Sequence, residues 1–188
     1  MVKRMKIMTF NIQSCKDFIT KEFNYKKCGD LINEYKPDVL GLNEVTKGNN
    51  FDISPRYFDQ PLALATYCGY KYYYFCEAIV IHDIAPYGNM VLSNSDIRNI
   101  ELVKIPDPEK DEDCYYESRA IIKCEINNII FLITHMGLAS GERINGVKEI
   151  IKLTTKETKP IILMGDFNME PDNEIIKPLY HMLTIKSK

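Results

Sequence analysis

The sequence predicts an α/β fold of the mixed α+β kind, with two layered β-sheets flanked by helices. Strand-like and helix-like segments alternate near both ends of the chain, whereas the middle holds consecutive β segments. No apolar run approaches the roughly 20 residues that a membrane-spanning helix needs. The length of 188 residues suits one domain, and we therefore predict a single domain over residues 1–188.

The expected strands are short runs of apolar or alternating sequence: Lys6–Ile12, Asp38–Val45, Tyr70–Cys76, Tyr87–Ser93, Asp96–Ile105, Tyr116–Ile126, Ile129–Thr134 and Pro160–Met164. Asn127 and Asn128 predict a two-residue hairpin turn, because asparagine tolerates positive φ. The aromatic run Tyr70–Phe75 is expected to form a buried strand edge. Pro106–Asp113 is expected to be a solvated acidic loop.

The expected helices have apolar residues at helical spacing: Phe23–Tyr35 ended by Pro37, a weaker segment from Ser54-Pro55 to about Cys68-Gly69, Glu142–Leu153, and a final helix from about Asp172 with Asp172 or Asn173 as its cap. Pro55 suits a first helical turn, whereas Pro61 is expected to interrupt the same segment. The helix that starts at Glu142 is expected to turn four residues inward: Ile144, Val147, Ile150 and Ile151.

Composition argues against several classes of protein. The net charge is −2 and no basic tail is present, so the chain lacks the gross electrostatic signature of a nucleic-acid binder, although a local basic face is compatible with this charge. The six cysteines form no CxxC pair, which predicts free thiols in a reducing compartment. Thr9 and Asn11 interrupt the apolar residues that follow the basic start. We therefore predict no signal peptide, no membrane insertion and a cytoplasmic location.

Polar side chains of a particular kind follow four of the expected strands: Asn11, Glu44, His135, and the pair Asp166 and Asn168. Each has an ordinary explanation when taken alone, such as a solvated glutamate or the turn chemistry of Asp-x-Asn. Together they fit the cleavage of a phosphate ester. An extended backbone would place Asp166 and Asn168 on one face and turn Phe167 into the core.

Phosphate-ester cleavage needs a cation and hydrogen-bond donors around an anionic group. Mg²⁺ prefers carboxylate and amide oxygens, which Glu44 and Asn11 would supply. His135 would stabilise the negative charge that develops on the phosphate oxygens. Asp166 would orient the attacking water, and the amide of Asn168 would hold the phosphate.

Six ordered motifs resemble those of the endonuclease/exonuclease/phosphatase superfamily, which has the deoxyribonuclease-I-like fold: MTFNI (8–12), GLNEV (41–45), YGNMVLSN (87–94), ESRA (117–120), THMGL (134–138) and GDFNMEP (165–171). The resemblance covers about residues 5–175. It implies a four-layer α/β sandwich and phosphoester hydrolysis that depends on Mg²⁺ or Mn²⁺.

The resemblance also implies roles for individual residues. Glu44 matches the direct metal ligand, and Asn11 lies on the metal side. His135 matches the contact to the scissile phosphate, Asp166 the residue that positions the nucleophile, and Asn168 the amide that binds phosphate.

Two further residues match the family's pattern less closely. Tyr87 lies near the family's phosphate-contacting tyrosine, but the motif does not fix its register before the glycine. Arg119 matches an arginine that the family carries on a strand, and the resemblance assigns it to substrate binding. Pairing of Arg119 with Glu117 or another nearby acid is an equal alternative.

The chain departs from the family's pattern at its C-terminal end. Family members close with two further strands, the second of which ends in Ser-Asp-His, and that histidine accepts the proton of the water. The chain has three histidines, His82, His135 and His181, and none of them follows an aspartate. We therefore expect a C-terminally shortened domain that lacks the last strands, and an open edge that permits self-association.

Two hypotheses for the function follow. The first is a Mg²⁺-dependent phosphoesterase, namely a nuclease, phosphodiesterase or phosphatase, impaired by the missing Ser-Asp-His. The second is an inactive module of the same fold that binds phosphate or a partner. The substrate would be a nucleic acid or a small phosphorylated molecule, and the acidic loop disfavours a nonspecific nuclease.

Overall fold

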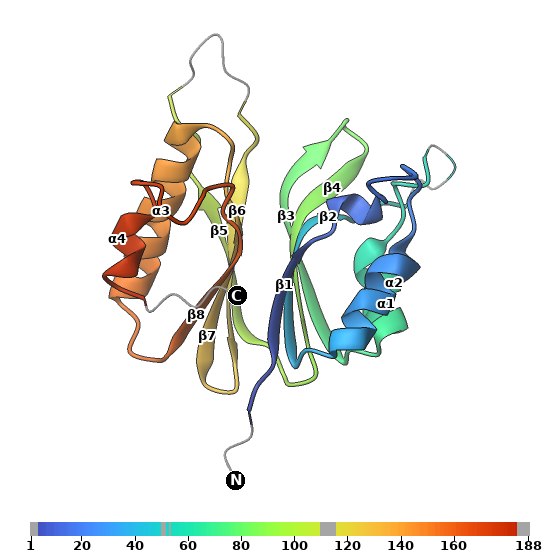
Figure 1. The fold of residues 1–188 in the computed structure, drawn as a ribbon, viewed down its shortest axis with the longest axis horizontal. Helices are drawn as coiled ribbons and strands as arrows, with labels where there is room; N and C mark the ends of the chain where they lie inside the picture. The colour runs from blue at the N-terminus through green and yellow to red at the C-terminus, as the bar shows by residue number, and fades with distance from the viewer. Residues whose placement is uncertain (1–3, 50–51, 53, 110–115, 184–188) are drawn as a thin grey trace.

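Two four-stranded sheets pack face to face, and helices cover the outer face of each sheet (Figure 1). This computed structural model describes residues 4–49, 52, 54–109 and 116–183. The layers are helix, sheet, sheet and helix, which confirms the predicted four-layer α/β sandwich.

Each sheet is mixed, as predicted. The first has the strand order β1-β2-β4-β3, with β1 and β2 parallel and the other pairs antiparallel. Its strands are β1 (Ile7–Asn11), β2 (Val39–Thr46), β3 (Tyr72–Ile81) and β4 (Ala85–Ser93). The second has the order β5-β6-β7-β8, with β7 and β8 parallel and the other pairs antiparallel. Its strands are β5 (Arg98–Ile105), β6 (Arg119–Ile126), β7 (Ile129–His135) and β8 (Ile161–Asp166).

The helices explain why each sheet contains a parallel pair. Parallel neighbours need a crossover connection, and a helix lies between the two strands of each pair in the chain. The first sheet is covered by α1 (Tyr25–Tyr35) and α2 (Gln60–Cys68), and the second by α3 (Ser140–Thr155) and α4 (Lys177–Tyr180). A short 3₁₀ turn, η1 (Gln13–Cys15), follows β1.

Three of the apolar clusters pack the layers against one another. Val91, Phe131 and Ile133 are buried between the two sheets. Leu42 and its neighbours pack the first sheet against α1 and α2, and Ile150 belongs to the core between the second sheet and α3. Because the inner core lies between the sheets, side chains at the ends of the strands can meet across it.

The predicted start of α2 is wrong. Ser54-Pro55 lies in a turn, and the helix begins at Gln60 after Asp59, whose side chain accepts from the N–H of Leu62 at 2.9 Å. Pro61 therefore lies in the first turn, where its missing N–H removes no intrahelical bond. The predicted end near Gly69 is correct, and this residue has φ of 72°.

The predicted hairpin between β6 and β7 is confirmed. Asn127 and Asn128 form its turn with φ of 52° and 63°, as a two-residue turn of the primed type requires. In the acidic loop, residues 106–109 carry no regular secondary structure and residues 110–115 lie outside the described ones.

The last two helices differ from prediction in detail. Ile144 of α3 is 40% exposed rather than inward, whereas Val147 and Ile150 are buried as expected. The final helix starts at Lys177, not near residue 172, and the side chain of Asn173 accepts from a backbone N–H in the preceding turn. The side chain of Asn173 forms a local turn with this N–H instead of capping a helix that starts there.

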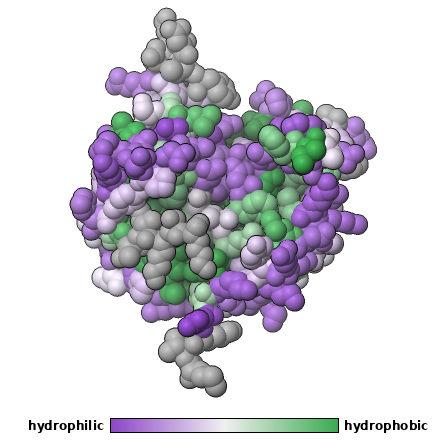
Figure 2. Space-filling view, in the orientation of Figure 1, coloured by the Kyte–Doolittle hydropathy of each residue, from purple (hydrophilic) through white to green (hydrophobic). Residues whose placement is uncertain are grey.

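β1 and β8 are outer strands of their sheets, and within the described residues one edge of each pairs with no other strand. Ile7 of β1 is 37% exposed. Figure 2 shows hydrophobic side chains in the middle of this face, beside the two strands, and hydrophilic ones around its periphery. β3 is also an outer strand, which explains why Tyr72 and Tyr73 are 41% and 42% exposed rather than buried as predicted.

Two predictions from composition can be compared with the structure. The described cysteines are free thiols, as predicted, and Cys114 lies outside the described residues. Among the described residues, no helix is long and apolar enough to cross a membrane.

Candidate active site

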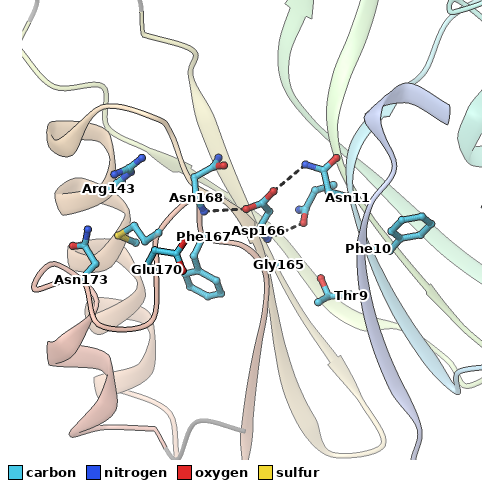
Figure 3. A pocket seen from close by; sticks show the side chains of 12 residues that line it. Thr9, Phe10, Asn11, Arg143, Gly165, Asp166, Phe167, Asn168, Glu170 and Asn173 are labelled. Atoms are coloured by element: carbon cyan, nitrogen blue, oxygen red, sulfur yellow. Dashed lines mark hydrogen bonds between the residues drawn. The ribbon is translucent and has the colours of Figure 1, made fainter. Parts of the chain in front are cut away.

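The predicted polar residues meet where the two parallel strand pairs end. Asn11 ends β1 in register with Asn43 of β2, and His135 ends β7 in register with Asp166 of β8. The carboxyl ends of parallel strands lie at one edge of a sheet, so each pair delivers its polar residues to the same place. Figure 3 shows Asn11 and Asp166 facing each other between β1 and β8.

Asn11 joins the two carboxylates of the site. Its Nδ2 donates to Oε1 of Glu44 at 2.8 Å and to Oδ2 of Asp166 at 3.0 Å. Its own Oδ1 accepts from the backbone N–H of Gln13 at 3.1 Å. Two neighbouring carboxylates repel each other unless a donor or cation lies between them. In this conformation Asn11 orients the two acids, while its own oxygen is occupied.

Glu44 reaches the site through a β-bulge. The pairing of β2 with β4 shifts between Leu42 and Val45, and Glu44 has φ of 58° within this irregularity. A bulge re-aims a side chain, and a left-handed non-glycine residue stores backbone strain that the surrounding structure must offset. Its side chain is 25% exposed, so Glu44 is held in place but stays accessible to a ligand.

His135 is buried between two donors. Nη1 of Arg119 lies 3.0 Å from its Nδ1, and Nδ2 of Asn168 lies 3.2 Å from its Nε2. A neutral imidazole has one acceptor nitrogen, so it cannot accept from both. Because arginine only donates, Nδ1 is the acceptor and the ring proton is on Nε2. This N–H points towards the acidic side of the site, where Oε1 of Glu44 lies 3.9 Å away.

The surroundings of His135 favour its neutral form. Burial lowers its pKa below the usual value, and the positive charge of Arg119 lowers it further. The carboxylates of Glu44 and Asp166 act in the opposite direction but do not outweigh burial. The neutral ring still carries one N–H, so His135 can donate a hydrogen bond at neutral pH.

Arg119 pairs with Glu117, which is one of the two alternatives that the sequence left open, and its assignment to substrate binding stays a prediction. Its Nη2 lies 2.5 Å from Oε2 of Glu117, while Nη1 contacts His135. The residue is 9% exposed, and its Nε has no hydrogen-bond partner among the described residues. The guanidinium therefore places positive charge directly behind the imidazole of His135.

Asp166 and Asn168 lie together, but not on extended backbone as predicted. Asn168 has φ of 51°, and its N–H donates to Oδ1 of Asp166 at 2.9 Å in a tight turn. Burial acts to raise the pKa of Asp166, but hydrogen bonds from Asn11 and from the N–H of Asn168 outweigh it and lower the pKa. Phe167 packs against the core beside α3, as expected.

Gly165 brings β8 close to β7 just before this turn. It has φ of 144°, and a Cβ at this position would lie 1.8 Å from the carbonyl oxygen of Thr134. The glycine of the GDFN motif is therefore required for the position of Asp166 as well as for the backbone conformation.

Two asparagines that the sequence analysis did not assign connect the sheets beneath the site. Nδ2 of Asn43 donates to Oδ1 of Asn89 at 2.8 Å and to the carbonyl of Thr134 at 2.9 Å. Oδ1 of Asn43 accepts from the N–H of Asp166 at 2.9 Å. Both amides are almost fully buried, and Asn89 also donates to the carbonyl of Ala120. The position of each amide inside an apolar strand is the sequence signal that could have identified them.

Tyr87 lies on β4 next to the acidic side of the site. Burial raises the pKa of its phenol, and the negative charges of Glu44 and Glu117 raise it further. A hydrogen bond to Glu44 acts in the same direction. The phenol of Tyr87 is therefore neutral at ordinary pH, and its predicted contact with phosphate stays a prediction.

A cleft of about 780 Å³ opens beside these groups. Asn11, Asp166 and Asn168 line it, and so does Arg143 of α3, which the sequence analysis did not single out. Nothing in the sequence pattern marked Arg143, because its position depends on how α3 packs. His82 lies in the turn after β3 and His181 follows α4, and neither belongs to the lining of the cleft.

The acidic side of the site carries oxygen donors. Among the described residues, no three His, Cys, Asp or Glu side chains converge as a set that could hold a metal ion. Mg²⁺ usually needs one or two carboxylates and keeps several of its waters. The two carboxylates that Asn11 bridges, Glu44 and Asp166, fit this more open kind of coordination.

The fold and the site define a class of protein: a four-layer α/β sandwich with one polar site where its sheets meet. The model of the endonuclease/exonuclease/phosphatase family matches residues 8–180, and the chain belongs to this family. This agrees with the resemblance seen in its motifs.

Solved structures with a similar fold include three from different organisms. An endonuclease/exonuclease/phosphatase from Beutenbergia cavernae is 20% identical, with a TM-score of 0.73 over 91% of this chain and 50% of that chain. A mannosyl-6-phosphatase from Bacteroides thetaiotaomicron is 13% identical, with a TM-score of 0.69 over 95% and 71%. The human Nocturnin catalytic domain with a bound sulfate anion is 21% identical, with a TM-score of 0.61 over 92% and 67%.

The chain thus spans about half the length of the Beutenbergia protein. A comparison with curated protein sequences finds no match.

Proposed function

We propose that this protein hydrolyses phosphoester bonds with the help of a divalent metal ion, Mg²⁺ or Mn²⁺. The observation that carries the proposal is the meeting of two carboxylates with a histidine, an arginine and an amide at the end of the sheets. Negative oxygens of Glu44 and Asp166 lie next to N–H donors of Asn11, His135 and Asn168, as a cation and an anionic phosphate together require, although Glu44 and His135 are not among the residues that line the cleft.

Glu44 would hold the metal, with Asp166 beside it and Asn11 fixing the orientation of both carboxylates. A bound Mg²⁺ or Mn²⁺ would neutralise phosphate charge and polarise the bond that breaks. The strained backbone of Glu44 supports this role, because strain of this kind clusters at functional sites.

His135 and Asn168 would bind the phosphate. The Nε2–H of His135 would donate to a phosphate oxygen, and Arg119 supports the ring through its contact with Nδ1. Nδ2 of Asn168 is held by the carbonyl of Met136 at 2.7 Å, which leaves its second N–H for the same anion. Donors fixed before the substrate arrives stabilise a transition state without further reorganisation.

Asp166 would orient the attacking water. Its low pKa keeps it ionised, so it can accept a hydrogen bond from water near neutral pH. Among the residues that line the cleft, no histidine is placed to act as the general base of the family's Ser-Asp-His.

The comparisons support a phosphorylated substrate but not one particular kind. One similar structure is a mannosyl-6-phosphatase and another contains a sulfate anion, which resembles phosphate in shape and charge. A nucleic acid or a small phosphorylated molecule fits the site equally. The cytoplasmic location and self-association through the free edges of β1 and β8 stay predictions, and sedimentation over a range of concentrations tests the latter.

The test is hydrolysis of bis(p-nitrophenyl) phosphate while Mg²⁺ or Mn²⁺ is titrated. The wild type should show metal-dependent release of nitrophenol, Glu44→Ala should lose both rate and metal affinity, and the exposed Glu174→Ala should match the wild type. Equal rates and equal metal affinity for wild type and Glu44→Ala would overturn the proposal. Phosphate binding without turnover would favour the inactive phosphate-binding module instead.

A further inference from the structure

Arg143 lines the cleft from the first turn of α3. Its backbone N–H donates to the carbonyl of Ala139, which fixes the start of the helix at this position. The neighbouring Glu142 is buried, and its carboxylate accepts from the backbone N–H groups of Ala139 and Glu117 at 2.9 and 3.3 Å. The carboxylate of Glu142 is therefore bonded to backbone N–H groups and does not pair with the guanidinium of Arg143.

Two consecutive carbonyls place Arg143 beside Asn168. Nε of Arg143 donates to the carbonyl of Gly137 at 3.2 Å, and Nδ2 of Asn168 donates to the carbonyl of Met136 at 2.7 Å. The two acceptor carbonyls belong to adjacent residues, about 3.8 Å apart along the chain, and both side chains line the same cleft. Figure 3 shows both of them on the α3 side of the cleft.

The loop that supplies these carbonyls is closely packed. A Cβ on Gly137 would lie 2.2 Å from the carboxyl carbon of Glu142. The loop therefore fits tightly against the capping glutamate, and both acceptor carbonyls are held in position. The hydrogen bond from Nε to the carbonyl of Gly137 therefore holds the Arg143 side chain in a defined position.

The rest of the guanidinium is available for a ligand. The Nε bond to Gly137 is the side-chain hydrogen bond that Arg143 makes, and within the described residues no acidic side chain forms an ion pair with it. Its two Nη groups present a fork of donors that matches two oxygens of a phosphate. The residue is only partly buried, so a ligand in the cleft can reach it.

The hydrogen bonds of the donors distinguish Arg143 from the groups around the histidine. Arg119 contacts Nδ1 of His135 and Asn168 contacts its Nε2, whereas the Arg143 side chain donates to the loop carbonyl of Gly137. Arg119 therefore supports the histidine, and Arg143 lies on the α3 side of the cleft. A single phosphate at His135 leaves Arg143 without a partner, whereas a second anionic group further along the cleft would pair with it.

We propose that Arg143 binds a second phosphate of the substrate, located one linkage away from the phosphoester that is cleaved. This inference rests on the proposed function and narrows its substrate class to molecules with two phosphates close together. Such a pair occurs in a phosphorylated nucleic-acid end and in a small bisphosphate. Both present the same chemistry to Arg143.

The experiment measures binding by calorimetry without added metal, so that no turnover is needed. One arm compares the thymidine dinucleotide dTpdT with its 5′-phosphorylated form pdTpdT, and the other compares fructose 6-phosphate with fructose 1,6-bisphosphate. The wild type should bind the doubly phosphorylated probe of at least one arm about 10 to 100 times more tightly, the range expected for charged hydrogen bonds. The arm with the advantage identifies the source of the second phosphate.

Three variants make the test specific. Arg143→Gln keeps an N–H for the carbonyl of Gly137 but removes the charge, and it should reduce the advantage to less than about 3-fold while leaving the affinity for the singly phosphorylated probe unchanged. Arg143→Lys should restore part of the advantage. Arg98→Ala removes an exposed arginine that pairs with Asp96, outside the lining of the cleft, and should behave like the wild type.

The outcomes separate this inference from the proposed function. If Arg143→Gln keeps the wild-type advantage, or if the wild type has none in either arm, Arg143 is not a phosphate subsite. Hydrolysis of bis(p-nitrophenyl) phosphate is measured alongside. An advantage that Arg143→Gln loses supports the subsite even without hydrolysis, whereas hydrolysis without any advantage supports the function and overturns the subsite.

Discussion

The two sheets contribute different chemistry to the site. The first sheet supplies Asn11 and Glu44, an amide and a carboxylate that fit the metal side. The second sheet and the turn after it supply Arg119, His135 and Asn168, whose N–H groups suit an anion. The difference suggests that binding of a cation and binding of a phosphate can be changed separately, by substitutions in one sheet or the other.

Asp166 does not follow this division between the sheets, because it connects the metal side to the phosphate side. It belongs to the second sheet but shares the amide of Asn11 with Glu44, and its backbone N–H donates to Asn43. The separation of roles therefore depends on a fixed distance between the sheets. Buried amides are suited to this, because their bonds are directional and costly to leave unmade.

The largest effect is expected from Glu44→Gln in the first sheet. Loss of a charged oxygen ligand should reduce kcat/KM by about 10³-fold, since metal coordination contributes several kcal/mol of transition-state stabilisation. Higher Mg²⁺ should recover part of this loss, because the defect is in metal affinity. Kinetics at several metal concentrations check this. A loss that no metal concentration alters would contradict the assignment of Glu44 to the metal side.

A somewhat smaller effect is expected from His135→Ala in the second sheet. Removing one preorganised donor to the phosphate should lower kcat by about 10²- to 10³-fold. Added Mg²⁺ should not recover it, and the metal affinity measured by titration should stay near that of the wild type. If His135→Ala behaved like Glu44→Gln in its metal dependence, the proposed separation between the sheets would be wrong.

Asn43→Ala should weaken the link between the sheets. It leaves the carbonyl of Thr134, the amide of Asn89 and the N–H of Asp166 without their partner, and we expect a loss of about 3 kcal/mol in the free energy of unfolding. Urea denaturation measures this loss. The exposed Asn94→Ala is the matched control and should change stability by less than about 1 kcal/mol. Equal stability of the two variants would show that the buried amide network does not hold the sheets together.

The smallest effect concerns pH. His135 has a lowered pKa in the folded state, so below its ordinary value of 6.5 the unfolded chain binds this proton more readily than the folded one. Its contribution to stability is therefore complete above pH 6.5 and is lost as the pH falls towards the folded pKa. Unfolding free energies between pH 7.5 and about 5 should decline less steeply for His135→Gln. An unchanged slope would contradict the burial argument.

Strand ends were predictable from the sequence because polar residues end apolar runs, and this placed Asn11, His135 and Asp166 at the ends of β1, β7 and β8. Glu44 was expected to end its strand as well, but it lies within β2 at a bulge. The backbone at Asn168 was not predictable by that reasoning, since a local hydrogen bond to Asp166 favours a left-handed turn over extension. The start of α2 was missed because Pro61 was taken as an interruption of the helix.

Other features depend on tertiary packing that periodicity does not report. Arg143 reaches the cleft only because the loop after β7 offers the carbonyl of Gly137. Asn43 and Asn89 lay inside motifs that resemble the family's, but their pairing across the sheets required the fold. Ile144 has helical spacing yet faces outward, because the stripe that α3 buries is narrower than its apolar pattern.

The most direct test of the account is anomalous diffraction from crystals soaked with Mn²⁺ and sulfate. The account predicts one manganese peak at the carboxylates of Glu44 and Asp166, at a metal-to-oxygen distance of about 2.2 Å, with the sulfate bonded to Nε2 of His135 and to Asn168. A manganese ion bound away from Glu44, or a sulfate that contacts neither His135 nor Asn168, would contradict it.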